Sequence, residues 1–206
     1  CCLSGNSRNI LVGKHLKEYN YGEKKERTSD YYKSVAIHET GHAYVSYISG
    51  DKPSYITIES RGGYGGYMQH ANQEDVASYT RDELYARIRI SLAGRAAEEV
   101  FYGKEKSLNT GASGDLEHAT DIAFQIVCKY GMEDNQLIIL KRDEVLQSAL
   151  AGEYTAKVNE ILKNEMKNTI TTIENAKYKI REIADVLIRE NKLTGKQFQE
   201  LMEADG

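Results

Sequence analysis

Apolar side chains recur every three or four residues along most of this 206-residue chain. This spacing is typical of amphipathic helices. It predicts helices over residues 30–49, about 81–101, about 115–130 and about 153–190, and a short last helix after Thr194-Gly-Lys-Gln197. The apolar stripe of the long C-terminal region does not keep strict heptads, so it indicates core packing rather than a coiled coil. The pattern therefore predicts a mainly α-helical domain.

One segment alternates with the period of a β-strand instead. Ser54–Glu59 is rich in β-branched and aromatic residues, a glycine-rich turn follows at Arg61–Gly66, and Tyr67–His70 is able to pair back. A phosphate-binding loop is the other interpretation of these glycines, but no Gly-Lys-Ser/Thr follows to hold phosphate and magnesium. We expect one small β-hairpin within the helical domain.

Composition narrows the class of protein. A formal charge of −4 gives no basic face for nucleic acid, and no apolar run approaches the roughly 18 residues of a membrane span. Three cysteines are too few for a disulfide framework, and Cys128 lies in an apolar helical stretch, which favours a reducing intracellular compartment. We interpret 1–27 as an N-terminal connector or remnant and 28–206 as one domain, with long C-terminal helices over about 153–203.

The chemistry is concentrated in His38-Glu39-Thr40-Gly41-His42, inside the first predicted helix. Residues four apart lie on the same helix face, so both histidine rings are able to reach one metal ion. Glu39 then lies beside the metal, where a carboxylate acts as general base for an attacking water. Gly41 in mid-helix predicts close packing or substrate approach. The alternative is a pair of histidines that are hydrogen-bonded without any metal.

Catalytic zinc usually has three protein ligands, so a third is needed. The longer zinc motif with a third histidine is excluded, because Val45 and Ile48 stand at the relevant positions. The remaining candidates are His70, Glu98, Glu99, Asp115, His118 and Asp121. Spacing alone does not choose between Glu99 and Asp115.

Four blocks of sequence resemble the M41 peptidase domain of the FtsH family of ATP-dependent zinc metalloproteases. The blocks are Val35–Ala43, Ser60–Gly63 with Gly66–Gln69, Leu92–Glu99 and Thr110–Thr120. They occur in family order between about residues 27 and 132, and the tail around Lys192–Lys196 is similar as well. Four ordered blocks are far more specific than the histidine motif alone.

The resemblance implies a helical metallopeptidase domain with an edge strand near its active site. It implies one Zn²⁺ per chain held by His38, His42 and Asp115, with Glu39 as the catalytic base. Glu99 matches a family glutamate once considered as a ligand, and we keep it as a residue that holds a ligand in place. The strand Tyr55, Ile56, Thr57, Ile58 and Glu59 falls where the family binds extended substrate.

The resemblance also implies partners and a location. The substrates would be unfolded or damaged polypeptides, the assembly a hexamer of identical chains, and the full protein would carry an ATPase module that this sequence lacks. That protein would work at the cytoplasmic face of a membrane, or in the cytoplasm if it has no anchor. Without the ATPase, we expect the chain to cleave only substrates that are already unfolded.

Two other functions fit the sequence less well. The chain could be an inactive helical oligomerisation or adaptor domain with a structural zinc, but such a domain would not need Glu39 to fold. It could also be a zinc hydrolase that acts on something other than peptides, against which the substrate strand is a weak argument.

Overall fold

The computed structural model describes residues 29–59, 66–70, 78–132 and 138–204. The first helical and strand elements are α1 (Ser29–Ile48), β1 (Pro53–Thr57), β2 (Tyr67–His70), α2 (Arg81–Tyr102), α3 (Lys104–Ser107) and α4 (Ser113–Phe124). They are followed by the π-helical turn η1 (Gln125–Lys129), α5 (Arg142–Leu146), α6 (Ala151–Asn175), α7 (Lys177–Glu190), β3 (Lys192–Thr194) and α8 (Gly195–Glu203). The prediction of a mainly α-helical domain is confirmed. The predicted connector 1–27 and most of the predicted turn at 61–66 lie outside the described residues.

Helices α1 and α2 cross in close contact at Gly41. A side-chain Cβ at this position would lie 2.7 Å from both the Ala93 carbonyl oxygen and the Ala97 Cβ. Only a residue without a side chain lets the two backbones approach this far. The predicted close packing at Gly41 is therefore confirmed, and it fixes the helix of the histidine motif against α2.

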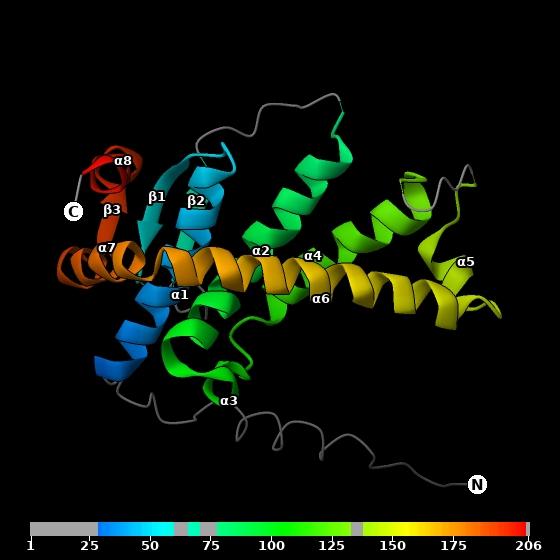
Figure 1. Cartoon of the computed structure of the whole chain (residues 1–206), viewed down its shortest axis with the longest axis horizontal. Coiled ribbons are helices and arrows are strands. Elements are labelled where there is room, and N and C mark those ends of the chain that lie inside the picture. The colour runs from blue at the N-terminus through cyan, green and yellow to red at the C-terminus, as the bar shows by residue number, and fades with distance from the viewer. Residues whose placement is uncertain (1–28, 60–65, 71–77, 133–137, 205–206) are drawn as a thin grey trace, which may run out of the picture.

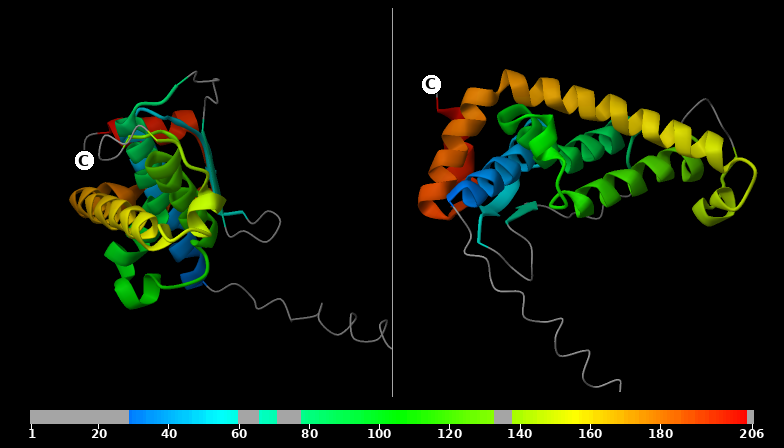
Figure 2. Two further views of the ribbon diagram at one scale, coloured as in Figure 1. Left: turned by 90° about the vertical axis from the view of Figure 1, so that its right-hand side faces the viewer. Right: turned by 90° about the horizontal axis from the view of Figure 1, so that it is seen from below.

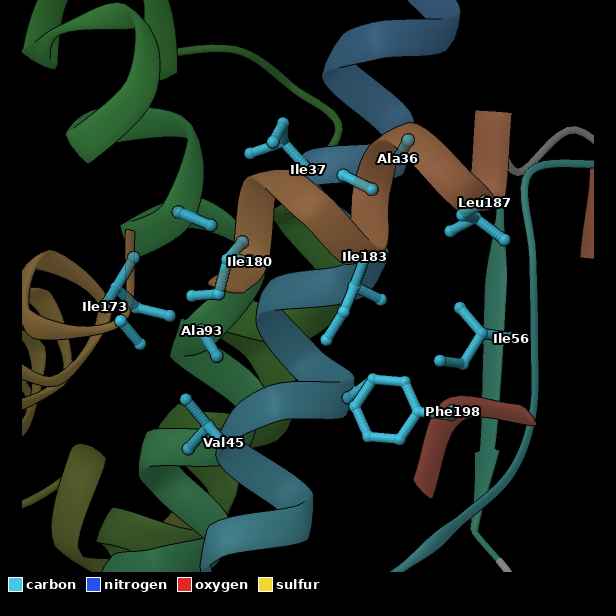
Figure 3. Close-up of a cluster of buried hydrophobic side chains, with 14 of the residues drawn as sticks. Ala36, Ile37, Val45, Ile56, Ala93, Ile173, Ile180, Ile183, Leu187 and Phe198 are labelled. Carbon is cyan, nitrogen blue, oxygen red and sulfur yellow. The ribbon is translucent and has the colours of Figure 1, made fainter. Parts of the chain in front are cut away.

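A large apolar cluster packs around α1 and includes Ala93 and Ala97 of this crossing. Figure 3 shows side chains from α1, β1, α2, α6, α7 and α8 meeting in it. Its labelled members are Ala36, Ile37, Val45, Ile56, Ala93, Ile173, Ile180, Ile183, Leu187 and Phe198. Burial of a side chain such as Leu187 or Phe198 contributes about 1.5–3 kcal/mol. The cluster anchors α1 from behind and leaves its other face for the site.

The predicted long helical region 153–190 is divided in two. The backbone leaves helical geometry at Ala176 (φ −104°, ψ 11°), so α6 and α7 run in different directions. Figures 1 and 2 show α6 along the length of the molecule and α7 turned away at one end. The turn lets α7 pack on α1 while α6 packs on α2, which one straight helix could not do.

The predicted hairpin is present, and a third strand joins it. Strand β1 pairs antiparallel with β2 on one side and with β3 on the other, in the order β2-β1-β3. Tyr55, Ile56 and Thr57 therefore have strand neighbours on both sides, and the expectation that this strand offers a free edge to substrate is wrong. Sequence reasoning missed β3 because three residues are too few to show alternation. Within the described residues, the outer edge of β2 has no strand beside it.

No helix in the described part of the chain has the length and apolar character needed to cross a bilayer.

Candidate metal centre

Three donor atoms from two helices converge at one point. His38 and His42 lie on α1, one turn apart, and Asp115 lies in the first turn of α4. The two histidine Nε2 atoms are 3.1 Å apart, and the Asp115 Oδ2 atom is 3.2 Å from the first and 3.3 Å from the second. Ligands 2.0–2.1 Å from a tetrahedral zinc lie roughly 3.3 Å from one another. The three atoms thus form one triangular face of a zinc tetrahedron.

The outer hydrogen bonds of the two rings show what this triangle lacks. His38 Nδ1 faces the Glu98 carboxylate at 2.7 Å, and His42 Nδ1 faces the Ile90 carbonyl at 2.7 Å. Both partners are acceptors, so each neutral ring carries its proton on Nδ1. Both Nε2 atoms then present lone pairs to each other and to the Asp115 carboxylate. Three acceptors without a donor require a cation between them, either a proton or a metal ion.

The pKa values show the same demand for positive charge. Burial opposes the charged form of His38, but hydrogen bonds with Asp115 and Glu98 outweigh it and raise its pKa to about 10. Burial also opposes the charged form of Asp115, yet its hydrogen bonds with His38 and His42 hold its pKa well below the ordinary value. Without a metal, the site therefore keeps a proton where the metal would bind.

Gly94 on α2 leaves the space that a metal ion needs. A Cβ at Gly94 would lie 2.4 Å from His38 Nε2 and 2.5 Å from His42 Nε2. Any side chain here would occupy the point toward which the ring nitrogens are directed. The donor set and this space fit a zinc ion, with Gly94 behind it.

The carboxylate that holds His38 in place belongs to Glu98, whereas the sequence had directed attention to its neighbour Glu99. Glu98 is buried, and its second oxygen accepts a hydrogen bond from Asn109 Nδ2 at 2.6 Å. The Asn109 Oδ1 atom in turn accepts from the Gly111 N–H at 2.8 Å. Glu98 stands four residues after Gly94, on the same helix face, and this spacing is the signal that sequence reasoning missed.

Glu39 lies beside the two histidines and is almost fully buried. Burial raises the pKa of its carboxyl group, while the two histidines act in the opposite direction. A Cβ at Gly66, next to the first residue of β2, would lie 2.7 Å from the Glu39 Oε1 atom. The carboxylate is thus held between the metal point and the start of the edge strand.

A cavity of about 490 Å³ opens over these groups and is lined by α1, the β2 edge, α2 and α4. Its lining includes His38, Glu39, His42 and Asp115, and also Tyr67, Met68, His70 and His118. A peptide segment of several residues fits a volume of this size.

The other candidate ligands lie away from the metal point. His70 Nδ1 pairs with Asp51 Oδ2 at 2.7 Å, and His118 Nδ1 is 2.9 Å from Ser91 Oγ. Asp121 forms an ion pair with Arg142. Among the described residues, only His38, His42 and Asp115 form a group of three able to hold a metal ion.

A mainly helical domain with two histidines and an aspartate around one metal point, next to a buried carboxylate, has the groups that a metalloprotease needs. The model of the family described as peptidase family M41 matches residues 25–201. The chain belongs to peptidase family M41.

Curated relatives of the chain carry the name ATP-dependent zinc metalloprotease FtsH. The protein of Mesomycoplasma conjunctivae is 35% identical over 93% of this chain, and that of Ruminiclostridium cellulolyticum is 34% identical over 88%. The protein of Aquifex aeolicus is 43% identical over 59% of this chain. These matches cover 28%, 32% and 19% of the relatives, so the chain spans a third or less of their length.

Proposed function

We propose that this chain is the proteolytic domain of an ATP-dependent zinc endopeptidase that hydrolyses peptide bonds in unfolded polypeptides. The observation that carries the proposal is the triangle of acceptors formed by His38, His42 and Asp115 next to the buried Glu39. One Zn²⁺ per chain would satisfy the triangle, and a cavity of about 490 Å³ lies over it and would admit a substrate segment.

In the proposed reaction, Glu39 moves the proton. His38, His42 and Asp115 would hold a zinc ion, which would supply an acidified water and would polarise the scissile carbonyl group. The Glu39 carboxylate accepts the proton of the attacking water and passes it to the amine that leaves. Burial raises the pKa of this carboxyl group, which makes its carboxylate a stronger base. Glu98 and the Ile90 carbonyl keep the two histidine rings in the tautomer that binds metal.

The substrate strand in this proposal lies along β2, in place of the expected β1. Tyr67, Met68 and His70 all line the cavity, and Gly66 brings the same strand against Glu39. An extended peptide that pairs with β2 would form main-chain hydrogen bonds with little demand on its own sequence. Such binding suits unfolded chains, whose backbone is exposed.

The names of the relatives and the resemblance of the motifs support the wider assembly. We propose that in the full protein this domain works with an ATPase module, in a hexamer, at the cytoplasmic face of a membrane. The ATPase would unfold substrates and deliver them to the β2 edge. The isolated domain would then cleave only polypeptides that are already unfolded.

The test is cleavage of an unfolded, casein-like protein by the zinc-loaded chain, with Glu39→Gln as the matched variant. We expect the native chain to cleave, and the variant to lose about 10²- to 10⁴-fold in rate because it lacks the base. The variant should retain one zinc per chain, since Glu39 is not a ligand. A variant as active as the native chain would contradict the role of Glu39. A zinc-loaded chain that cleaves no unfolded polypeptide would contradict the proposed function of this domain.

A further inference from the structure

We propose that His118 is a further catalytic residue, which donates a hydrogen bond from Nε2 to the substrate's carbonyl oxygen as that oxygen becomes negatively charged. The inference rests on the proposed peptidase function and extends it. It concerns a histidine that is not among the metal ligands and that lines the same cavity.

Helix α4 places His118 one turn from the metal point. His118 follows Asp115 by three residues within α4, so the two side chains lie on the same helix face, roughly 5–6 Å apart at Cβ. Asp115 is the residue whose carboxylate faces both Nε2 atoms. From one helical turn away, the His118 side chain is able to reach an atom that lies between it and the metal point.

Helix α2 leads to the same position independently. His118 Nδ1 is 2.9 Å from Ser91 Oγ, and Ser91 precedes Gly94 by three residues on the same helix face. Gly94 is the residue whose added Cβ would touch the Nε2 atoms of His38 and His42. Ser91 thus lies one helical turn from the metal point on α2. Its hydrogen bond with His118 keeps the His118 ring at that distance.

The partners of Ser91 decide which way the His118 ring donates. The Ser91 hydroxyl lies 3.0 Å from the Arg87 carbonyl oxygen and 2.9 Å from His118 Nδ1. When this hydroxyl donates its proton to Nδ1, the neutral imidazole ring carries its hydrogen on Nε2. This bond orients the ring and leaves Nε2 for the cavity. The lining of the cavity also includes Arg87 on α2 and Asp115 on α4.

The position of His118 complements that of Glu39. Glu39 comes from α1 and lies against the start of β2, whereas His118 comes from α4 and is held by α2. A carbonyl group above the metal point would thus have the base on one side and a hydrogen-bond donor on the other. His118 is also exposed, as expected of a group that contacts substrate and does little for folding. Donors aimed at a developing negative charge are among the strongest contributors to catalysis.

The test uses three substitutions of His118 in the zinc-loaded chain. The amide nitrogen of asparagine is separated from Cβ by as many bonds as histidine Nδ1. The amide nitrogen of glutamine is separated from Cβ by as many bonds as histidine Nε2. His118→Asn therefore keeps the bond to Ser91, whereas His118→Gln keeps a donor toward the cavity. We expect His118→Ala and His118→Asn to lose about 100-fold in kcat with little change in KM. His118→Gln should stay within about 10-fold of the native chain.

Two measurements besides activity complete the test. Bound zinc should remain one per chain in all three variants. The affinity for a phosphinic peptide, whose tetrahedral phosphorus carries a negatively charged oxygen, should fall about 100-fold in His118→Ala, because such compounds imitate the transition state. Affinity for an ordinary peptide, measured with Glu39→Gln as background, should change much less.

The opposite ranking would overturn the inference: an active asparagine variant beside an inactive glutamine variant means that only the bond to Ser91 matters. Native rates in all three variants would overturn it as well. If asparagine and glutamine variants both resemble the alanine variant, an unchanged phosphinic-peptide affinity overturns the inference and a 100-fold loss supports it. These results require a native chain that cleaves, so a native chain without activity instead refutes the proposed function, and this inference with it.

Discussion

The floor of the cavity and its rim are built in opposite ways. The floor is mostly buried and consists of His38, His42, Glu98 and Asp115. These side chains contact one another across α1, α2 and α4. The rim, formed by the edge of β2 with His70 and by His118, is more exposed. His70 contacts Asp51 and Ser46, and His118 contacts Ser91. The same residue type, histidine, therefore stands in two environments.

The difference follows from what each region must bind. A metal ion needs donors fixed to within a few tenths of an ångström, and burial with outer hydrogen bonds provides that. A polypeptide of variable sequence needs an accessible backbone edge and donors that remain open to it. In the proposed function, the buried floor would hold the ion and the open rim would bind the substrate.

The largest expected effect comes from filling the metal point. In Gly94→Ala, the new Cβ would lie 2.4–2.5 Å from both ring nitrogens, so the rings must move apart. We expect zinc affinity to fall by at least about 100-fold, beyond the 10- to 100-fold effect of losing an outer partner. Peptidase activity should fall with it. Titration of the metal-free chain with zinc measures the change.

Gly152→Ala is the matched control for this substitution. Gly152 is also helical, in α6, and an added Cβ there would meet no atom within 4 Å. Zinc affinity should remain native. Native zinc affinity in Gly94→Ala as well would show that the floor is not as tightly fixed as we infer.

A smaller effect is expected from the outer hydrogen bond of the floor. Glu98→Gln removes the negative charge that faces His38 Nδ1. We expect zinc affinity to fall about 10- to 100-fold, as is usual for partners of metal-binding histidines. Glu99→Gln makes the same change at the neighbouring carboxylate, one oxygen replaced by an amide nitrogen, and should have little effect on zinc affinity. Equal losses in both variants would mean that overall charge, rather than the contact with His38, sets the affinity.

A further expected effect concerns the dependence of stability on pH in the metal-free chain. The pKa of folded His38 is raised to about 10 from 6.5, so its protonation stabilises the fold fully below about pH 6.5. This contribution is lost as pH rises from there toward about 10. Glu39, whose pKa is also raised, acts in the same direction. Urea unfolding should therefore show a metal-free chain that becomes steadily less stable across this range.

The zinc-loaded chain is the control for pH, because the metal replaces the proton at the floor. Its free energy of unfolding should depend on pH much less over the same range. A His38→Gln variant without metal should also lose most of the slope. Parallel slopes for the metal-free and zinc-loaded chains would place the titrating group elsewhere.

Much of the fold could be predicted because helices depend on local patterns. The capping box at Thr80 and Glu83 begins α2 within one residue of the predicted start, and the box at Thr194 and Gln197 begins α8. The break at Ala176 was not predicted, because the apolar stripe continues through it and only packing on two different helices separates α6 from α7. The three-residue β3 was missed for the same reason: it is defined by its partner β1.

The sequence by itself determined the helix of His38, Glu39 and His42, since a spacing of four residues places two rings on one face whatever surrounds them. It also restricted the third donor to a few acidic or histidine side chains. Only the tertiary structure brought Asp115 to the two rings, chose Glu98 over Glu99 as the partner of His38, and placed β1 in the middle of the sheet. These choices depend on how helices and strands far apart in the chain pack, and a local pattern carries no information on that.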